Sequence, residues 1–73
     1  MKKQNTGTFG SRVKELRDLK GWSIFRLSQN SGIREATLRS WEAGERVGSR
    51  PDLLIKLSGA LGTSIDYLQK GAE

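Results

Sequence analysis

The 73-residue sequence contains no cysteine and no histidine, and it has a single proline. Without cysteine the chain can form neither a disulfide nor a thiolate metal site. Without histidine it lacks the side chain that proteins use most often for metal binding and for acid–base catalysis. The sequence also has no paired carboxylates in an apolar setting and no glycine loop that would cradle a phosphate. We therefore expect no cofactor, no metal site, no catalytic residues and no enzymatic activity.

Long apolar runs are also missing. The longest, Leu53–Ile55, is far shorter than the roughly 20 residues that a transmembrane helix requires. Lys2 and Lys3 are not followed by the apolar segment of a secretory signal. We therefore expect a soluble protein of the cytoplasm with no membrane partner.

Positive charge is in excess, with 13 lysines and arginines against eight aspartates and glutamates and a net charge of +5. Such a balance on a small domain favours an anionic partner, either nucleic acid or a membrane surface. The net charge alone does not show whether the protein has such a partner or is simply basic.

A first helix is predicted from a Thr8 cap to about Lys20, where Gly21 can end it. Apolar residues recur along it at i, i+4, i+7 and i+10, the spacing of one helix face, and Arg12 falls among the polar residues of the other face. The predicted buried face consists of Phe9, Val13, Leu16 and Leu19.

The next two predicted helices are joined by a glycine turn, which is the pattern of a helix-turn-helix. Ser23 is a good cap for the first, Ile24–Ser31, and Gly32 can end it in the left-handed conformation. Three apolar residues of this helix cannot all share one side, so we expect one of Ile24, Phe25 and Leu27 to be partly exposed. The second helix is predicted over Glu35–Ala43, with Leu38 and Trp41 on its buried side.

Two further helices are predicted after the loop Glu45–Arg50. Pro51 suits the first position of a helix that ends at Gly62, and apolar residues including Ile55 surround most of it, so it should be the central core helix. Gly59 inside this helix indicates either close backbone packing or simple tolerance of glycine. Ser64 is a cap for a fifth helix that ends near Lys70.

The pattern as a whole predicts an all-α, compact five-helix domain over residues 8–70, with a flexible arm at 1–7 and a frayed end at 71–73. The arm is either a disordered terminus or a basic segment whose two lysines contact DNA phosphates. The expected structural core is Val13, Leu16, Trp22, Leu27, Leu38, Trp41, Leu54, Leu57 and Leu61.

The order of these signals resembles the Cro/C1-type (XRE) helix-turn-helix family, which includes the lambdoid phage repressors and Cro proteins. The resemblance covers Phe9 to about Lys70, and the combined spacing carries it rather than any single motif. The matching segments are G-W-S at 21–23, Leu27, Gly32-Ile33, Thr37-Leu38, W-E-x-G-E at 41–45, and the run Leu57–Leu68.

This resemblance implies a lambda-repressor-like domain whose partner is double-stranded DNA and whose third helix enters the major groove. Such proteins usually bind as two-fold dimers, so a homodimer is expected, at least on DNA. Carried over by position, the residues that contact bases are Arg34, Glu35, Ala36, Arg39 and Ser40. Those expected at the DNA backbone are Ser23, Thr37, Arg17, Arg46 and Arg50. Arg17 and Glu42 also match positions that often form an ion pair in this family.

The chemistry of individual residues leaves alternatives open. Arg34 or Arg39 can bind guanine through two hydrogen bonds or can hold a phosphate. Glu35 can accept from a cytosine amino group, or it can simply stabilise the N-terminus of its helix. The loop residues Arg46 and Arg50 are either phosphate clamps or solvated side chains.

The sequence departs from the family pattern at three places. Ile24 stands where a phosphate-binding glutamine is common, and Arg34 where a Ser, Thr or Asn cap is usual. The loop before Pro51 also appears one residue longer and contains Gly48 and Ser49.

Ile24 and a possible exposure of Phe25 support an alternative function, a protein-interaction module of the same fold such as an antitoxin or an anti-repressor partner. For the dimer, the expected surface is the Tyr67–Leu68 region together with Gly71 and the residues beyond it. The sequence does not indicate the operator or the sense of regulation.

Overall fold

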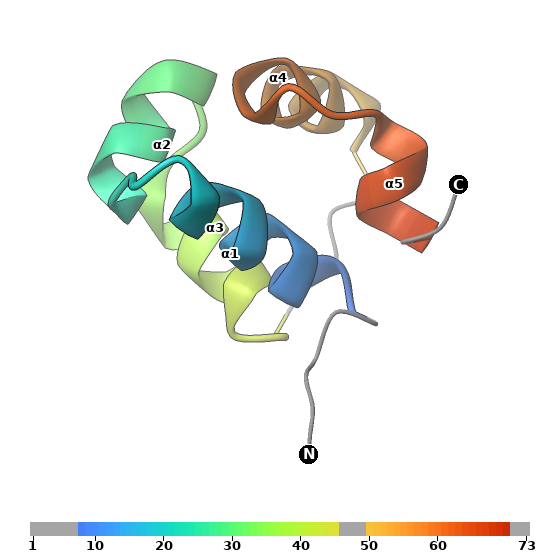
Figure 1. Ribbon diagram of the computed structural model, residues 1–73, viewed down its shortest axis with the longest axis horizontal. Coiled ribbons are helices and arrows are strands. Elements are labelled where there is room, and N and C mark those ends of the chain that lie inside the picture. The colour runs from blue at the N-terminus through green and yellow to red at the C-terminus, as the bar shows by residue number, and fades with distance from the viewer. Residues whose placement is uncertain (1–7, 46–49, 71–73) are drawn as a thin grey trace.

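The computed structural model describes residues 8–45 and 50–70, the last of these in its backbone only. It contains five α-helices and, within those ranges, no strand (Figure 1). The chain is thus an all-α domain, as its periodicity predicts. The expected arm at 1–7, the frayed end at 71–73 and Arg46 lie outside the described residues. The five helices are α1 (Phe9–Leu19), α2 (Ile24–Ser31), α3 (Glu35–Glu42), α4 (Pro51–Leu61) and α5 (Ile65–Lys70).

Residues next to each helix in the chain determine where the helix begins and ends. Thr8 caps α1 by accepting from the Ser11 amide, Ser23 caps α2 by accepting from the Arg26 amide, and Ser64 caps α5 by accepting from the Tyr67 amide. At the other ends, α2 and α4 stop at glycines with φ of 77° and 73°, a conformation that costs glycine little. Capping residues and glycines therefore allowed the helix bounds to be predicted within about one residue.

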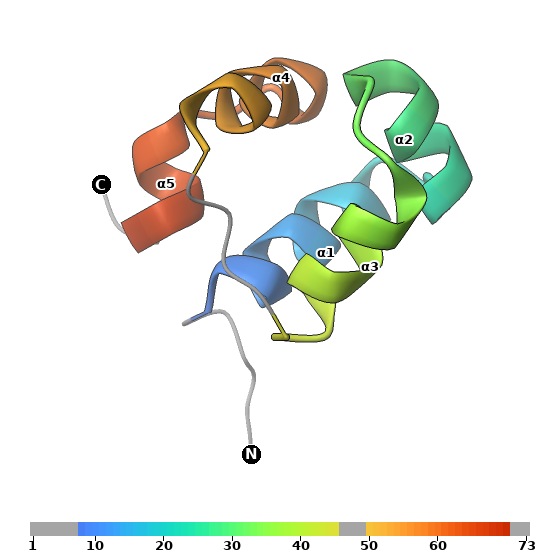
Figure 2. The same cartoon turned by 180° about the vertical axis from the view of Figure 1, so that it is seen from behind.

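The helices close into a ring around one core (Figures 1 and 2). Along this ring α1 packs on α3, α3 on α2, α2 on α4, α4 on α5, and α5 back on α1. The rings of Phe9 and Trp41 meet edge to face across the α1–α3 contact, with centroids 5.3 Å apart. The buried apolar residues are Phe9, Val13, Leu27, Ile33, Leu38, Trp41, Leu54, Leu57, Leu61 and Leu68, and Leu16, Trp22 and Ile24 are among the partly buried residues packed against them.

Two predictions for α1 were wrong. Leu19 is 77% exposed instead of buried. A residue at i+10 lies about 80° around the helix from residue i, so Leu19 is at the margin of the apolar face and in the last turn. Arg12 is only 2% exposed, because its Nε and Nη2 donate to the carbonyls of Leu68 and Gln69, each at 2.8 Å. Those carbonyls belong to the last turn of α5, where helical partners are missing.

The exposure of Ile55 in α4 and the burial of Leu68 in α5 also differ from expectation. Ile55 is exposed, so α4 buries one face only, through Leu54, Leu57 and Leu61. Gly59 has open space where a side chain would begin, so simple tolerance is the correct alternative there. Leu68 is fully buried in the core and cannot supply the expected dimer surface.

Candidate nucleic-acid interface

The turn between α2 and α3 is held by two serines that the sequence reasoning did not single out. Ser28 Oγ donates to the Ile33 carbonyl, and Ser31 Oγ accepts from the Ile33 amide at 3.2 Å. Ile33 itself is buried, so it anchors the start of α3 in the core. The sequence signal for this arrangement is weak, because serines at the end of a helix are common.

The exposed face of α3 carries the five residues predicted to contact bases. Arg34, Ala36 and Arg39 are exposed, while Glu35 and Ser40 are partly exposed. On the opposite side Leu38 and Trp41 are buried in the core. The helix therefore presents short and polar side chains outward from a fixed apolar base.

Two contacts lie within this exposed face. Arg39 Nη2 is 3.1 Å from Glu35 Oε1, one helical turn away. Ser40 Oγ is 3.5 Å from an oxygen of Glu45, which is a long contact for a hydroxyl donor. Most donors on this face therefore remain available to a partner.

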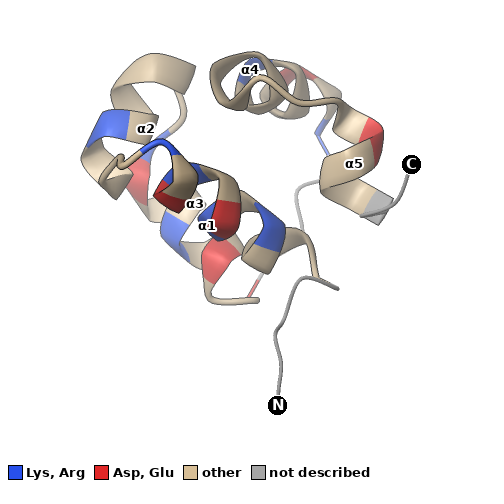
Figure 3. Cartoon of the chain, viewed as in Figure 1, with Lys and Arg blue, Asp and Glu red and all other residues tan. Residues whose placement is uncertain are grey.

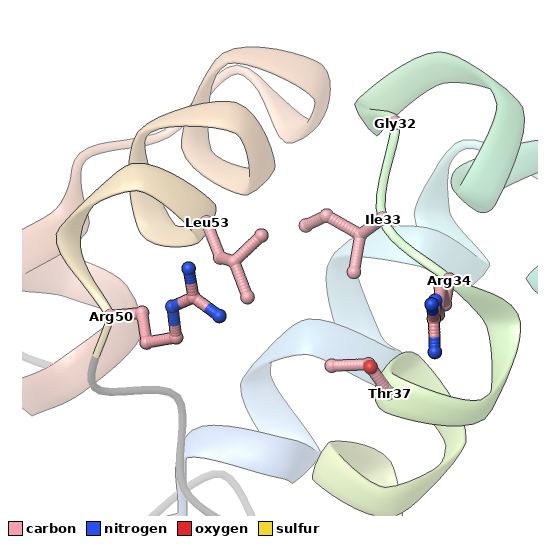
Figure 4. A pocket seen from close by; sticks show the side chains of 6 residues that line it. All are labelled: Gly32, Ile33, Arg34, Thr37, Arg50 and Leu53. Carbon is pink, nitrogen blue, oxygen red and sulfur yellow. The ribbon is translucent and has the colours of Figure 1, made fainter.

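A cleft of about 420 Å³ separates the N-terminus of α3 from that of α4 (Figure 4). Neither helix has a side-chain cap, because Arg34 and Arg50 occupy the cap positions without capping hydrogen bonds. The first-turn amides of both helices therefore lack side-chain partners, and helix N-termini favour anions. The residues lining the cleft are Gly32, Ile33, Arg34, Thr37, Arg50 and Leu53.

The two arginines beside this cleft are suited to an anion. Arg50 is exposed, and its ion pair with Asp52, at 3.2 Å, is also exposed to solvent. Such exposed pairs contribute little to stability. Thr37 adds a half-exposed hydroxyl to the cleft wall.

Arg17 occupies a different environment from the other predicted backbone contacts. Its Nε and Nη2 bind the two carboxylate oxygens of Glu42 at 2.8 and 2.9 Å, and its Nη1 donates to the Trp22 carbonyl at 2.7 Å. The hydrogen bond to Glu42 raises the pKa of Arg17 above its ordinary value. All three guanidinium nitrogens are thus engaged within the protein, and this side chain joins α1 to α3.

The start of α2 shows how the chain accommodates Ile24. This residue is half-buried and packs against the core, whereas its neighbour Phe25 is 57% exposed. The Ser23 hydroxyl remains exposed although its oxygen accepts from the Arg26 amide. Backbone amides, Ser23 and the exposed Arg26 are therefore the polar groups at this end of α2.

Basic and acidic residues are interspersed over α1 and α3, and α2 carries Arg26 without an acidic residue (Figure 3). Among the described residues, no group of three or more acidic or metal-ligating side chains could hold a metal ion. Within the same part of the chain, no helix has the length and apolar character needed to cross a membrane.

Comparison with known proteins connects this geometry to a family. A helix-turn-helix family model matches residues 13–68. The SPbeta prophage-derived HTH-type transcriptional regulator YonR of Bacillus subtilis is 42% identical over 65 residues, which cover 86% of this chain and 57% of YonR. The chain thus spans little more than half the length of that relative.

Two solved structures agree with the fold. SinR, a master regulator for biofilm formation, in complex with DNA has a TM-score of 0.79 at 30% identity, covering 84% of this chain and 97% of that one. The P22 c2 repressor in complex with a synthetic operator has a TM-score of 0.83 at 29% identity, covering 89% and 97%. The chain therefore belongs to the Cro/C1-type (XRE) helix-turn-helix family.

Proposed function

We propose that this protein is a sequence-specific regulator of transcription that binds double-stranded DNA and represses by occupying an operator. The observation that carries the proposal is the exposed face of α3, whose polar and small residues project from the buried Leu38 and Trp41. A major groove admits one α-helix and presents a different donor and acceptor pattern for each base pair. In this arrangement Arg34, Glu35, Ala36, Arg39 and Ser40 lie at the base edges.

Backbone contacts would come from both ends of this helix. Arg50 and Thr37 line the cleft at the uncapped N-termini of α3 and α4, which suits a phosphate. The exposed Ser23 and the amides at the start of α2 would hold another phosphate. Arg46, outside the described residues, remains a candidate from its position in the sequence. Arg17 is better assigned to holding α1 against α3, since each of its three guanidinium nitrogens already donates to a group within the protein.

The family and the named relatives support this proposal. Its members are DNA-binding transcription regulators rather than enzymes, and SinR and the P22 c2 repressor are both described in complex with DNA. A homodimer on DNA, with half-sites about one helical turn apart, and a cytoplasmic location in a bacterium belong to the same proposal. Because Leu68 is buried, the dimer contact must use other residues.

A protein-interaction module of the same fold is the second candidate, and the exposed Phe25 favours it. A fluorescence anisotropy titration on random duplex DNA separates the two functions. A DNA-binding domain should lose affinity steeply as salt rises, because phosphate contacts release counterions. Selection of bound duplexes from a random library should then yield a palindromic consensus. Weak, salt-independent binding and no enriched sequence would contradict the DNA-binding function.

A further inference from the structure

Glu35 and Arg39 form an ion pair that runs along the exposed face of α3. Arg39 Nη2 lies 3.1 Å from Glu35 Oε1. Residues four apart lie one above the other on a helix, and helical side chains lean toward the N-terminus. The pair therefore carries the Arg39 guanidinium from the second turn of α3 back over its first turn.

This position matters for a helix that enters a groove by its N-terminal end. The first turn carries Glu35 and Ala36 and follows directly on Arg34. Ala36 is exposed and small, so its side chain leaves room beside the guanidinium for a base edge. Without the ion pair, the long Arg39 side chain would be free to extend toward solvent or toward the other end of the helix.

The ion pair has little to contribute to folding. The Arg39 and Glu35 side chains are 64% and 34% exposed, and exposed pairs of this kind stabilise proteins only slightly. The order of the two charges is the favourable one, with the acid toward the N-terminus of the helix. The pair is thus suited to orienting a side chain rather than to holding the fold together.

We propose that Glu35 is a positioning residue that holds Arg39 ready to bind a guanine, and that the target site carries this guanine opposite the first turn of α3. Guanine presents two adjacent acceptors, O6 and N7, which match a pair of guanidinium N–H groups. A guanidinium has five N–H donors, so the contact with Glu35 leaves enough of them for the base. Ordering the arginine before binding reduces the entropy lost in the complex.

The same carboxylate argues against a phosphate as the partner of Arg39. A phosphate bound to this guanidinium would lie close to the negative charge of Glu35, and like charges repel. A base edge carries no net charge and avoids this repulsion. The inference rests on the proposed DNA-binding function and selects guanine as the ligand of Arg39 over the phosphate backbone.

The test is selection of bound duplexes from a random library by the full chain and by four variants, Glu35→Ala, Glu35→Asp, Arg39→Lys and the charge-matched control Glu15→Ala. Glu15 is an exposed acid on α1, away from the α3 face. Arg39→Lys keeps the charge but loses the paired donors. Circular dichroism measures the helical content of each variant, so that a loss of folding can be distinguished from a change in DNA preference.

Arg39→Lys should lower the preference for guanine at one position of the consensus by on the order of tenfold, the effect of a lost two-bond contact. Glu35→Ala should lower preference at that same position, while its affinity for random duplex stays equal to that of Glu15→Ala or rises. Glu35→Asp, which is shorter, should restore part of the preference. A structural role for the pair would change helical content or affinity for every sequence and leave the consensus unaltered.

Several outcomes would overturn the inference. If the wild type selects a consensus that Glu35→Ala leaves unchanged, the positioning role is wrong while the DNA-binding function stands. If the two variants change different positions, Glu35 contacts a base independently. If the wild type enriches no sequence and binds random duplex without salt dependence, the DNA-binding function fails and this inference fails with it.

Discussion

The backbone of Gly10 in α1 lies directly against the carbonyl group of Trp41 in α3. A Cβ atom placed on Gly10 would overlap the Trp41 carbonyl oxygen and lie about 3.1 Å from the Glu42 Cα. Both neighbours are backbone atoms, so they cannot move aside as a side chain can. This glycine therefore sets how closely α1 approaches the helix that carries the candidate interface.

Gly10→Ala should consequently destabilise the protein by about 2 kcal/mol or more, since overpacking against backbone forces the two helices apart. Urea denaturation followed by circular dichroism measures this change. The matched control is Gly59→Ala, also inside a helix but with nothing within 4 Å of the new Cβ. That variant should gain about 0.5–1 kcal/mol, the usual benefit of alanine over glycine in a helix. Equal effects of the two substitutions would contradict the close approach at Gly10.

These two glycines illustrate how far the sequence alone predicts the fold. Both lie inside predicted helices, and the pattern left close packing and simple tolerance open for Gly59, where the structure has open space. Helix bounds depend on residues close in the chain, such as Ser23 and Gly32, and were therefore predictable. Contacts between helices depend on how those helices are arranged in space, which a periodic pattern does not contain.

The same reason explains the other differences. Leu19 and Leu68 are equally apolar, but Leu19 lies in the last turn of α1 and is exposed, whereas Leu68 is buried in the core. Arg12 is buried because α5 ends over it, and nothing near Arg12 in the sequence indicates this. In the candidate interface, the spacing of the apolar residues in the sequence was enough to predict which face of α3 is exposed. It was not enough to predict the cleft between α3 and α4, because this cleft depends on where α4 begins in space.

Arg17 and Glu42 provide a second test, because their side chains are only 13% and 11% exposed. Removing one partner alone, as in Arg17→Met, should cost about 3 kcal/mol, since it leaves a largely buried charge unpaired. The double variant Arg17→Met with Glu42→Leu should recover much of this loss. Recovery should remain incomplete, because the Trp22 carbonyl also loses its donor. Denaturation midpoints of Arg17→Met, Glu42→Leu and the double variant measure this, and purely additive losses would contradict the pairing.

Stability should be constant between about pH 5.5 and 7, because the chain has no histidine, the side chain that ordinarily titrates there. In acid the Lys14–Asp18 pair should be lost. The hydrogen bond from Lys14 holds the pKa of Asp18 below its ordinary value of 3.8. A pKa lowered by folding adds stability that is present above the unfolded value and disappears as pH falls through the native value.

Asp18→Asn isolates this pair from the other carboxylates. The variant should be slightly less stable than wild type at pH 7, and the two should converge below about pH 4 when their urea midpoints are compared. The control is Glu15→Gln, an exposed acid on the same helix. A difference between wild type and Asp18→Asn that does not narrow as the pH falls below 3.8 would show that the pair does not act through this charge.

The final prediction concerns Arg50, which lines the cleft at the N-termini of α3 and α4. Arg50→Ala should weaken binding to all duplexes alike, because a phosphate contact carries no sequence information. The slope of log affinity against log salt should also become less steep by about one unit. Lys56→Ala removes the same charge from an exposed position of α4 and serves as the control. The salt slope of Lys56→Ala should change much less, because Lys56 does not line the cleft. Equal salt slopes for the two variants would mean that Arg50 acts only through the net charge of the protein.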